Sequence, residues 1–265
     1  MSSYTGRHAQ LYDLFYADKP YADEALFVHQ CLQKHGSGET TRLLELACGT
    51  GSHALALEKF GYQIVATDYS EDILAIARRK GREMSSTVDF RFQDMTDLRV
   101  SDGPFDAVIC LFDSIGYVAT NERIGSVLGG VHEQLRPDGL FIFEFWHAAA
   151  MLRSFDSLRV RRWNTDRGEI LRISETELDI AAQLCRVGYS IYEMNRDGTF
   201  ATLTETQVNR YFLVQEMDHW LTSFDFIPVK WFAGFTNDEN ITEGSWHIVS
   251  VARRGRGSLP GQRDK

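Results

Sequence analysis

Strand-like and helix-like segments alternate along the first 145 residues, and this alternation limits the fold more than any other feature of the sequence. Short apolar runs typical of buried strands alternate with longer stretches whose apolar residues recur at helical spacing. The predicted strands are residues 42–46, 63–67, 88–92, 105–112 and 140–145, the last one entered through a turn at residues 136–139. Because strand–helix–strand units form right-handed parallel crossovers, the sequence predicts an α/β fold with helices on both faces of a parallel sheet.

The pattern changes near residue 150, where extended segments separated by turn residues indicate an antiparallel meander. These segments are residues 159–163, 169–178, 184–193 and 199–212, and a helix at 214–223 and strands at 226–235 and 246–253 follow. Alternating charges at 159–179 are interpreted as the solvated face of a sheet, or as one that pairs with another subunit. The predicted units are a lid helix and core at 1–150, a β insertion at 151–212 that forms a substrate wall or a dimer surface, the completion of the core at 213–254 and a disordered tail at 255–265.

The overall charge limits the kind of partner. The 265 residues carry a formal net charge of −9, whereas phosphate-rich partners require a basic surface. No apolar run reaches the roughly 18 residues of a membrane span, and the N-terminus lacks the basic start and apolar core of a signal peptide. We therefore expect a cytoplasmic protein with neither a nucleic-acid nor a membrane partner.

The cysteines give no sign of a metal centre. Cys31, Cys48, Cys110 and Cys185 lie far apart and form no CxxC motif. A disulfide framework or a cysteine-ligated metal is therefore not expected, and no metal is predicted.

A glycine-rich turn follows the first predicted strand, in the sequence ELACGTG at residues 45–51. Gly49 and Gly51 permit a sharp turn and a close approach of the backbone to a ligand. The next strand ends at Asp68, whose carboxylate can accept hydrogen bonds from both hydroxyls of a ribose. NAD sites share this logic, but Ala54 stands where the dinucleotide fingerprint has its third glycine. A nucleoside site is predicted, with the dinucleotide left as the less favoured ligand.

Five segments in order resemble the motifs of class I S-adenosylmethionine-dependent methyltransferases. They are ELACGTG at 45–51, VATDYS at 65–70, QDM at 93–95, FDAVICLFDSIGY at 105–117 and LRPDGLFIFEF at 135–145. The resemblance covers about residues 42–145 and implies a Rossmann-like sheet of seven strands, here with an antiparallel β insertion after strand five. It also implies S-adenosyl-L-methionine as the cofactor.

The resemblance implies roles for particular residues. Gly49 and Gly51 would approach the amino-acid part of the cofactor, and Asp68 would hold the ribose. Asp94 and Met95 would border the adenine, with the Asp94 side chain near its amino group, although a methionine here can equally serve packing. The other expected cofactor residues are Tyr12, Tyr16, Glu45, Ala47, Tyr69 and Leu111. Glu45 either contacts the cofactor or supports the glycine loop, and Tyr12 and Tyr16 form either a lid or a packed helix face.

The acceptor side is expected around the loop at 112–117. This loop, the aromatic N-terminus and the insertion resemble the subgroup of sugar N,N-dimethyltransferases of deoxyaminosugar biosynthesis. That subgroup usually has histidine where this chain has Tyr117, which puts a histidine base in doubt. The candidate catalytic residues are Tyr117, Glu144 at the end of the fifth strand, and His147 just after it.

Three functions remain open on these grounds. The leading hypothesis is methyl transfer to the amine of an amino sugar or a similar small metabolite. The alternatives are O-methylation of a hydroxylated metabolite or nucleotide-linked sugar, and a non-catalytic cofactor-binding partner protein. A small-molecule acceptor is expected in the first two cases, and a homodimer is compatible with all three.

Overall fold

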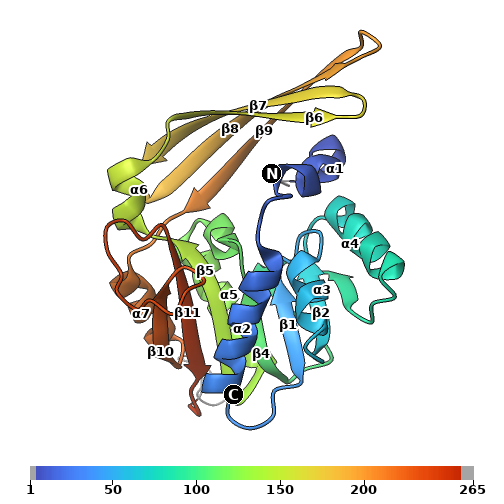
Figure 1. The fold of residues 1–265 in the computed structure, drawn as a ribbon. Coiled ribbons are helices and arrows are strands. Elements are labelled where there is room, and N and C mark those ends of the chain that lie inside the picture. The colour runs from blue at the N-terminus through green and yellow to red at the C-terminus, as the bar shows by residue number, and fades with distance from the viewer. Residues whose placement is uncertain (1–3, 258–265) are drawn as a thin grey trace.

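The computed structural model describes residues 4–257, and its core is a seven-stranded sheet in the order β10-β11-β5-β4-β1-β2-β3 (Figure 1). Strands β1 to β5 run parallel, whereas β11 is antiparallel to β5 and β10 is antiparallel to β11. The strands are β1 Arg42–Leu46, β2 Gln63–Asp68, β3 Asp89–Phe92, β4 Phe105–Cys110, β5 Leu135–Trp146, β10 Phe226–Ala233 and β11 His247–Arg254. The predicted α/β class and the seven-stranded sheet are confirmed.

Helices cover both faces of this sheet because its strands bury alternate side chains on opposite sides. Leu43 of β1 packs in a cluster with α2, α3 and α4, whereas its neighbour Leu44 packs in a second cluster with α5 and α7. These helices are α2 Tyr21–His35, α3 Ser52–Glu58, α4 Glu71–Glu83, α5 Asn121–Gln134 and α7 Val214–Ser223. None of the helices within residues 4–257 has the length and apolar character needed to span a membrane.

The predicted insertion is a separate antiparallel sheet of four strands in the order β6-β7-β8-β9. Its strands are β6 Leu158–Thr165, β7 Gly168–Asp179, β8 Leu184–Asn195 and β9 Phe200–Arg210. In Figure 1 this sheet lies above the edge of the core sheet at which the parallel strands end. Helix α1 (Gly6–Phe15) packs beneath it, since Leu11 and Phe15 share an apolar cluster with Ile170 and Ile191. The space between the two sheets is therefore the natural place for a site.

Local details differ from the prediction. The residues expected as a turn at 136–139 lie inside β5, where the register with β4 jumps from Phe105–Leu135 to Ala107–Leu140. The extra residues are accommodated as a bulge, so the strand starts earlier than its apolar run. Helix α6 (Ala148–Ser154) and the 3-10 turns η1 (Met95–Asp97) and η2 (Ser114–Val118) were not predicted.

Most of the predicted tail at 255–265 lies outside the described residues. Of its first three residues, the Gly255 amide donates to the Asp225 carbonyl at 2.6 Å, and Arg256 forms an ion pair with Asp138 at 2.6 Å. These contacts hold the start of the segment against the core.

Candidate functional site

A turn of left-handed residues links β1 to α3 and begins the site. Ala47, Gly49 and Gly51 have φ values of +51°, +56° and +77°. A Cβ atom on Gly49 would lie 3.5 Å from the Tyr12 hydroxyl, above a cavity that Gly49 lines. A Cβ atom on Gly51 would instead lie 2.6 Å from the Phe90 ring. Gly49 therefore leaves space for a ligand, whereas Gly51 is needed for the turn and for packing.

Asp68 ends β2 beside this turn. It is only 7% exposed, and its carboxylate accepts hydrogen bonds from the amides of Gly49 at 3.0 Å and Ser70 at 2.9 Å. Burial raises the pKa of Asp68, and the backbone hydrogen bonds oppose that shift. Asp68 and Tyr69 both line the same cavity as Gly49. The carboxylate thus ties two loops together at the edge where β1 and β2 end.

Glu45 is buried beneath the glycine turn, with 1% of its surface exposed. Among residues 4–257, its Oε2 atom has no hydrogen-bond partner. Burial and the nearby Asp68 carboxylate raise the pKa of Glu45 to about 8, so it is largely protonated at neutral pH. It lines a small second cavity together with Ala47 and Leu111. Since a buried polar atom without a partner is costly, Glu45 is a ready contact for a ligand at this turn.

The tyrosines at the C-terminal end of α1 pack against neighbouring side chains and also face the larger cavity. Tyr12 and Tyr16 line the larger cavity, and their ring centroids lie 4.8 Å apart. Tyr12 also shares an apolar cluster with Ala9 and Ile73, which joins α1 to α4. The two readings of these tyrosines, a lid and a packed helix face, are therefore compatible.

Five predicted residues line neither of the two cavities, namely Gly51, Asp94, Met95, Glu144 and His147. The Asp94 carboxylate caps η1 by accepting a hydrogen bond from the Thr96 amide at 2.8 Å, and Met95 packs against the apolar cluster of α5. His147 is 6% exposed, and its Nδ1 atom lies 3.1 Å from the Ser245 carbonyl oxygen. Burial lowers the pKa of His147. This histidine is therefore neutral at pH 7 and holds a loop.

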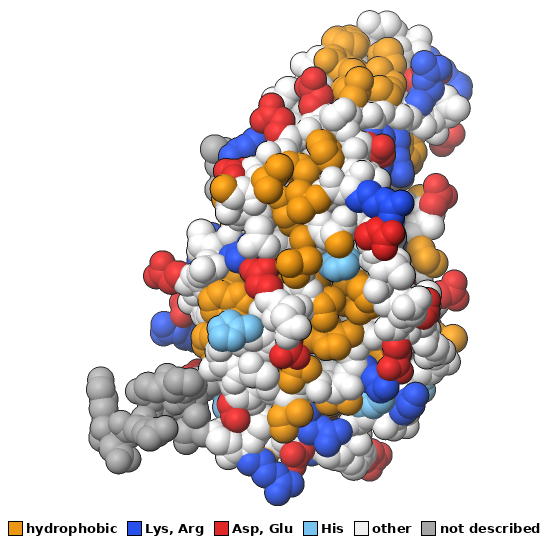
Figure 2. Space-filling view, turned by 90° about the vertical axis from the view of Figure 1, so that its left-hand side faces the viewer, with side chains coloured by type: hydrophobic (Ala, Val, Ile, Leu, Met, Phe, Trp, Pro, Cys, Tyr) orange, Lys and Arg blue, Asp and Glu red, His pale blue; other side chains and the backbone are white. Residues whose placement is uncertain are grey.

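The larger cavity, of about 510 Å³, extends from the glycine turn to the inner face of the insertion. Its lining on the insertion side comes from β6 to β9, and includes Arg159, Arg161, Arg172, Ser174, Tyr189, Gln207 and Asn209. The insertion thus supplies one wall of the cavity. Figure 2 shows that acidic and basic side chains are interspersed on one face of the molecule, without a continuous basic patch there.

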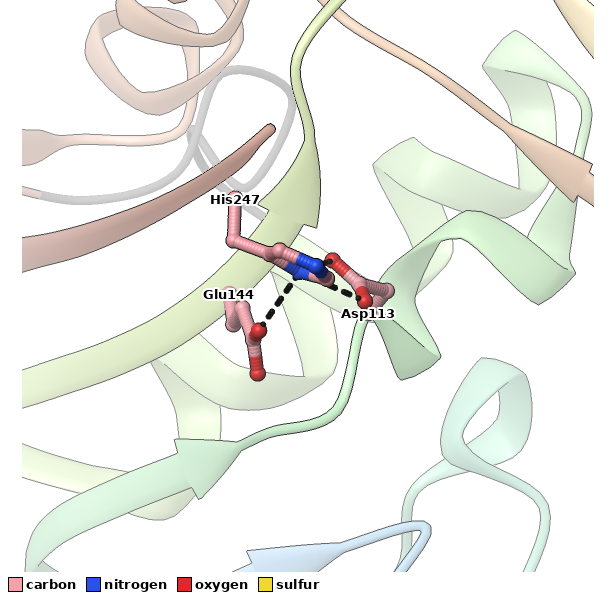
Figure 3. Close-up of side chains that lie close together, drawn as sticks. All are labelled: Asp113, Glu144 and His247. Carbon is pink, nitrogen blue, oxygen red and sulfur yellow. Dashed lines mark hydrogen bonds and ion pairs between the residues drawn. The ribbon is translucent and has the colours of Figure 1, made fainter. Parts of the chain in front are cut away.

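Two buried carboxylates, of Asp113 and Glu144, and the partly exposed imidazole of His247 form an acid–histidine cluster near the ends of β4 and β5 (Figure 3). The Nδ1 atom of His247 lies 2.9 Å from a Glu144 carboxylate oxygen and 3.1 Å from one of Asp113. The second Glu144 oxygen accepts a hydrogen bond from the Phe112 amide at 2.7 Å. Asp113 and His247 line the cavity, whereas Glu144 lies behind them. Glu144 therefore holds both the loop after β4 and the imidazole.

Electrostatics fix the protonation states in this cluster. Burial would lower the pKa of His247, but Asp113 and Glu144 outweigh it and raise the pKa to about 11. Burial and the Glu144 charge raise the pKa of Asp113 to about 6. At neutral pH the cluster therefore holds one imidazolium between two carboxylates, with a net charge of −1.

The same three residues could also offer ligands to a metal ion. Their ligand atoms all lie within 4.8 Å of one another. A cation there would have to displace the hydrogen bonds that His247 makes with both carboxylates.

The loop that carries Asp113 has an unusual backbone. Phe112 and Asp113 adopt φ values of +57° and +54°, which are uncommon for residues other than glycine. Such residues cost about 1–3 kcal/mol each and persist where the surroundings over-determine them, often at functional sites. Here the hydrogen bond from Phe112 to Glu144 supports the conformation.

Tyr117 lines the cavity at the end of this loop. Its hydroxyl lies 3.0 Å from that of Tyr4 and 3.3 Å from Gln207 Oε1. Burial, followed by the nearby Tyr16 and Tyr189, raises the pKa of Tyr117. It therefore remains a neutral phenol that can position a ligand but does not act as an anionic base.

Two residues of the acid–histidine cluster, Asp113 and His247, were missed as site candidates, although each carried a signal. Asp113 belongs to the loop that was expected to border the site, but it was not singled out. His247 starts β11, which is antiparallel to β5 and pairs His247 with Trp146. The first residue of an antiparallel strand shares an edge with the last residues of the parallel strands. Knowledge of the direction of β11 would therefore have pointed to His247.

Gly116 lies in η2, on the loop after β4, and gives a direct test of how β9 packs on that loop. A Cβ atom there would lie 1.6 Å from Asn209 Oδ1 and 2.7 Å from the Arg210 carbonyl oxygen. We expect Gly116→Ala to lower the free energy of unfolding by about 1–3 kcal/mol, as overpacking does. Denaturant unfolding measures this. Gly129→Ala is the control, because its Cβ would meet only the Phe224 ring at an ordinary 3.8 Å. Equal stability of the two variants would contradict the described packing.

Comparisons with known proteins point in one direction. The family model of the methyltransferase domain matches residues 43–139. A protein of Geobacillus sp. (strain WCH70), whose name assigns methyl transfer only provisionally and gives no acceptor, is 26% identical over 93% of this chain and 98% of its own length. The dTDP-3-amino-3,4,6-trideoxy-alpha-D-glucopyranose N,N-dimethyltransferase of Streptomyces venezuelae is 34% identical over 52% of this chain and 57% of its own length.

Solved structures extend the likeness to the insertion. An S-adenosylmethionine-dependent methyltransferase from Clostridium acetobutylicum covers 94% of this chain and 98% of its own, with a TM-score of 0.79 and 21% identity. The sugar N-methyltransferase from Streptoalloteichus sp. covers 97% of both chains, with a TM-score of 0.78 and 20% identity. At these identities the likeness establishes the shared fold.

Proposed function

We propose that this chain, which belongs to the class I S-adenosylmethionine-dependent methyltransferases, methylates the amine of an amino sugar or a similar small metabolite. Methyl transfer from S-adenosylmethionine is the activity of the family. The amine acceptor is the proposed part, and the acid–histidine cluster of Asp113, Glu144 and His247 is the observation that carries it.

The residues at the glycine turn fit this cofactor. Gly49 has no side chain above the cavity, Asp68 presents a buried carboxylate, and Glu45 has an oxygen without a partner among the described residues. We propose that Asp68 receives the ribose hydroxyls and that Tyr12 and Tyr16 cover the cofactor. The bound cofactor supplies a methyl group on a good leaving group, so the protein has mainly to align the acceptor with it.

An amine acceptor has to lose a proton before or during attack. Asp113 is buried, lines the cavity and lies beside a second carboxylate, so an ammonium group is attracted to this position. We propose that Asp113 binds the ammonium group and takes up its proton, while the His247 cation keeps the cluster from carrying two negative charges. Tyr117 and Gln207 then orient the acceptor through their polar atoms.

The proposal is tested with a matched pair of acceptors. The purified chain is incubated with S-adenosylmethionine and either an amino sugar or the same sugar with a hydroxyl at that carbon. Mass spectrometry of the products is expected to show methyl groups only on the amine. Methylation of the hydroxyl sugar alone would support O-methylation, the alternative that Tyr117 left open, and would overturn the proposed acceptor.

The rate is expected to depend on pH through Asp113. Its pKa is raised to about 6, so the carboxylate is ionised above this value and becomes protonated as the pH falls through it. The kcat/KM for the amine should therefore fall below about pH 6. A profile from pH 4.5 to 8 measures this, and Asp113→Asn should lose the acidic limb. A variant that keeps the limb would show that another group titrates there.

The outer face of the insertion leaves room for association between subunits. Leu158, Val160 and Phe200 are 60%, 56% and 61% exposed on β6 and β9. A homodimer through this sheet stays a prediction, which light scattering of the purified chain checks.

A further inference from the structure

Arg172 is a buried cation in the cavity wall. It lies in the middle of β7, is 6% exposed and lines the cavity. Its Nε and Nη1 atoms have no hydrogen-bond partner anywhere in residues 4–257. Leaving a buried charged donor without an acceptor costs more than leaving a neutral one. The sequence pattern had placed this charge on a solvated face, which is wrong for Arg172.

Aromatic rings surround the Arg172 guanidinium, but they do not satisfy its hydrogen-bond donors. Its Cζ atom lies 4.6 Å from the centroid of Phe15, 5.1 Å from that of Trp163 and 5.3 Å from that of Tyr189. Such rings attract the cation, but they offer no oxygen acceptor for its N–H groups. The rings orient the guanidinium and leave its hydrogen-bonding capacity unused.

A second arginine, Arg161, lies directly opposite Arg172 on the neighbouring strand. The register of β6 and β7 pairs Arg161 with Arg172, and both side chains line the cavity. Like charges opposite each other on one face of a sheet are destabilising. Within the described part of the chain, no carboxylate forms an ion pair with either residue. The third arginine that lines the cavity, Arg159, is instead paired with Asp156 at 2.5 Å. Two unpaired cations thus share one wall in a protein with a net charge of −9.

We propose that Arg161 and Arg172 bind an oxyanion, a phosphate or carboxylate group, on the methyl acceptor. This inference rests on the proposed function and narrows it to acceptors that carry both an amine and an oxyanion. Guanidinium groups suit this role because their fork of donors matches the oxygens of phosphate and carboxylate. The cavity then has opposite charges on its two walls, with the carboxylate of Asp113 on the loop after β4 and the arginines on the insertion.

The test measures binding of anions without turnover. Pyrophosphate and malonate are titrated by calorimetry into the full chain loaded with S-adenosylhomocysteine. We expect one of them to bind, and the one that does identifies the oxyanion as phosphate or carboxylate. Arg161→Ala should weaken this binding at least tenfold. Arg172→Lys, which keeps the charge but loses the fork, should also weaken it. If that variant does not fold, Arg161→Ala decides alone because its side chain is at the exposed edge.

Arg162 provides a matched control. It neighbours Arg161 on β6 but points to the opposite face, where it lies 3.9 Å from Glu169. Arg162→Ala removes the same charge and should change the anion affinity less than twofold. Absence of binding of both anions, or an equal loss in Arg161→Ala and Arg162→Ala, would overturn the proposal. Since no acceptor amine is present, failure of amine methylation would be seen separately, in the product analysis.

Discussion

Asp68→Ala is expected to bind S-adenosylmethionine at least 100-fold more weakly than the unchanged chain. Under the proposed geometry the carboxylate accepts hydrogen bonds from two ribose hydroxyls. A hydrogen bond to a charged group contributes about 1.5–3 kcal/mol, and each 1.4 kcal/mol is a factor of ten. The loss of two such bonds therefore corresponds to roughly 100-fold or more. Isothermal titration calorimetry of the cofactor measures the change directly.

Two further variants separate this effect from damage to the fold. Asp68→Asn keeps an oxygen that can accept a hydrogen bond from the Gly49 amide, but it has no charge. Its affinity for S-adenosylmethionine should therefore lie between those of the unchanged chain and Asp68→Ala. Asp97→Ala removes an exposed carboxylate that, within residues 4–257, pairs only with Arg99, and it should bind the cofactor normally. An Asp68→Ala protein that is folded and binds the cofactor as tightly as Asp97→Ala would refute the ribose assignment.

Glu144→Gln is expected to lower kcat about 100-fold while it leaves the cofactor affinity within threefold. The glutamine amide can still accept a hydrogen bond from the Phe112 amide, but it removes a negative charge from beside His247. Glu144 is a positioning residue, because it acts through Phe112 and His247. A misplaced catalytic geometry of this kind commonly costs about two orders of magnitude in rate.

A spectroscopic measurement distinguishes this role from a merely structural one. The carboxylates of Asp113 and Glu144 raise the pKa of His247 to about 11, so the loss of one charge should lower it. Titration of the histidine resonances by NMR in the two proteins reports this shift. Asp106→Asn is the control. Its carboxylate binds Arg136 at 2.6 Å, and the residue lies near the start of β4, away from the cavity. The substitution should therefore affect stability but not kcat. An unchanged His247 pKa in Glu144→Gln would contradict the described cluster.

Most of the core could be predicted from the sequence because its central strands are buried on both faces. Leu43 and Leu44 serve opposite apolar clusters, so the whole of β1 reads as an apolar run between turn residues. The bounds of β1 agree with the prediction for this reason, and those of the helix α7 also agree. The start of β5 does not, because its first residues form a bulge that a local pattern does not show.

Only those site residues that lie near the ends of parallel strands could be predicted from the sequence. Asp68 ends β2 and Glu144 lies near the end of β5, and the direction of a parallel strand follows from the strand–helix alternation. His247 starts an antiparallel strand, and Arg172 lies inside one, where its burial depends on α1 packing against the insertion. These are contacts between distant segments, and no local period encodes them. The predicted positions of Asp94, Met95 and His147 came from resemblance or from position in the chain, and their side chains face other contacts.

The central claim is that the turn at Gly49 and the carboxylate of Asp68 jointly hold a nucleoside whose sulfur faces the cavity beside Asp113. A crystal structure of the chain with S-adenosylhomocysteine tests this most directly. The claim predicts both ribose hydroxyls within hydrogen-bond distance of Asp68 and the sulfur atom directed at the cavity shared by Asp113 and Tyr117. A nucleoside bound elsewhere, with Asp68 contacting only the Gly49 and Ser70 amides, would contradict it.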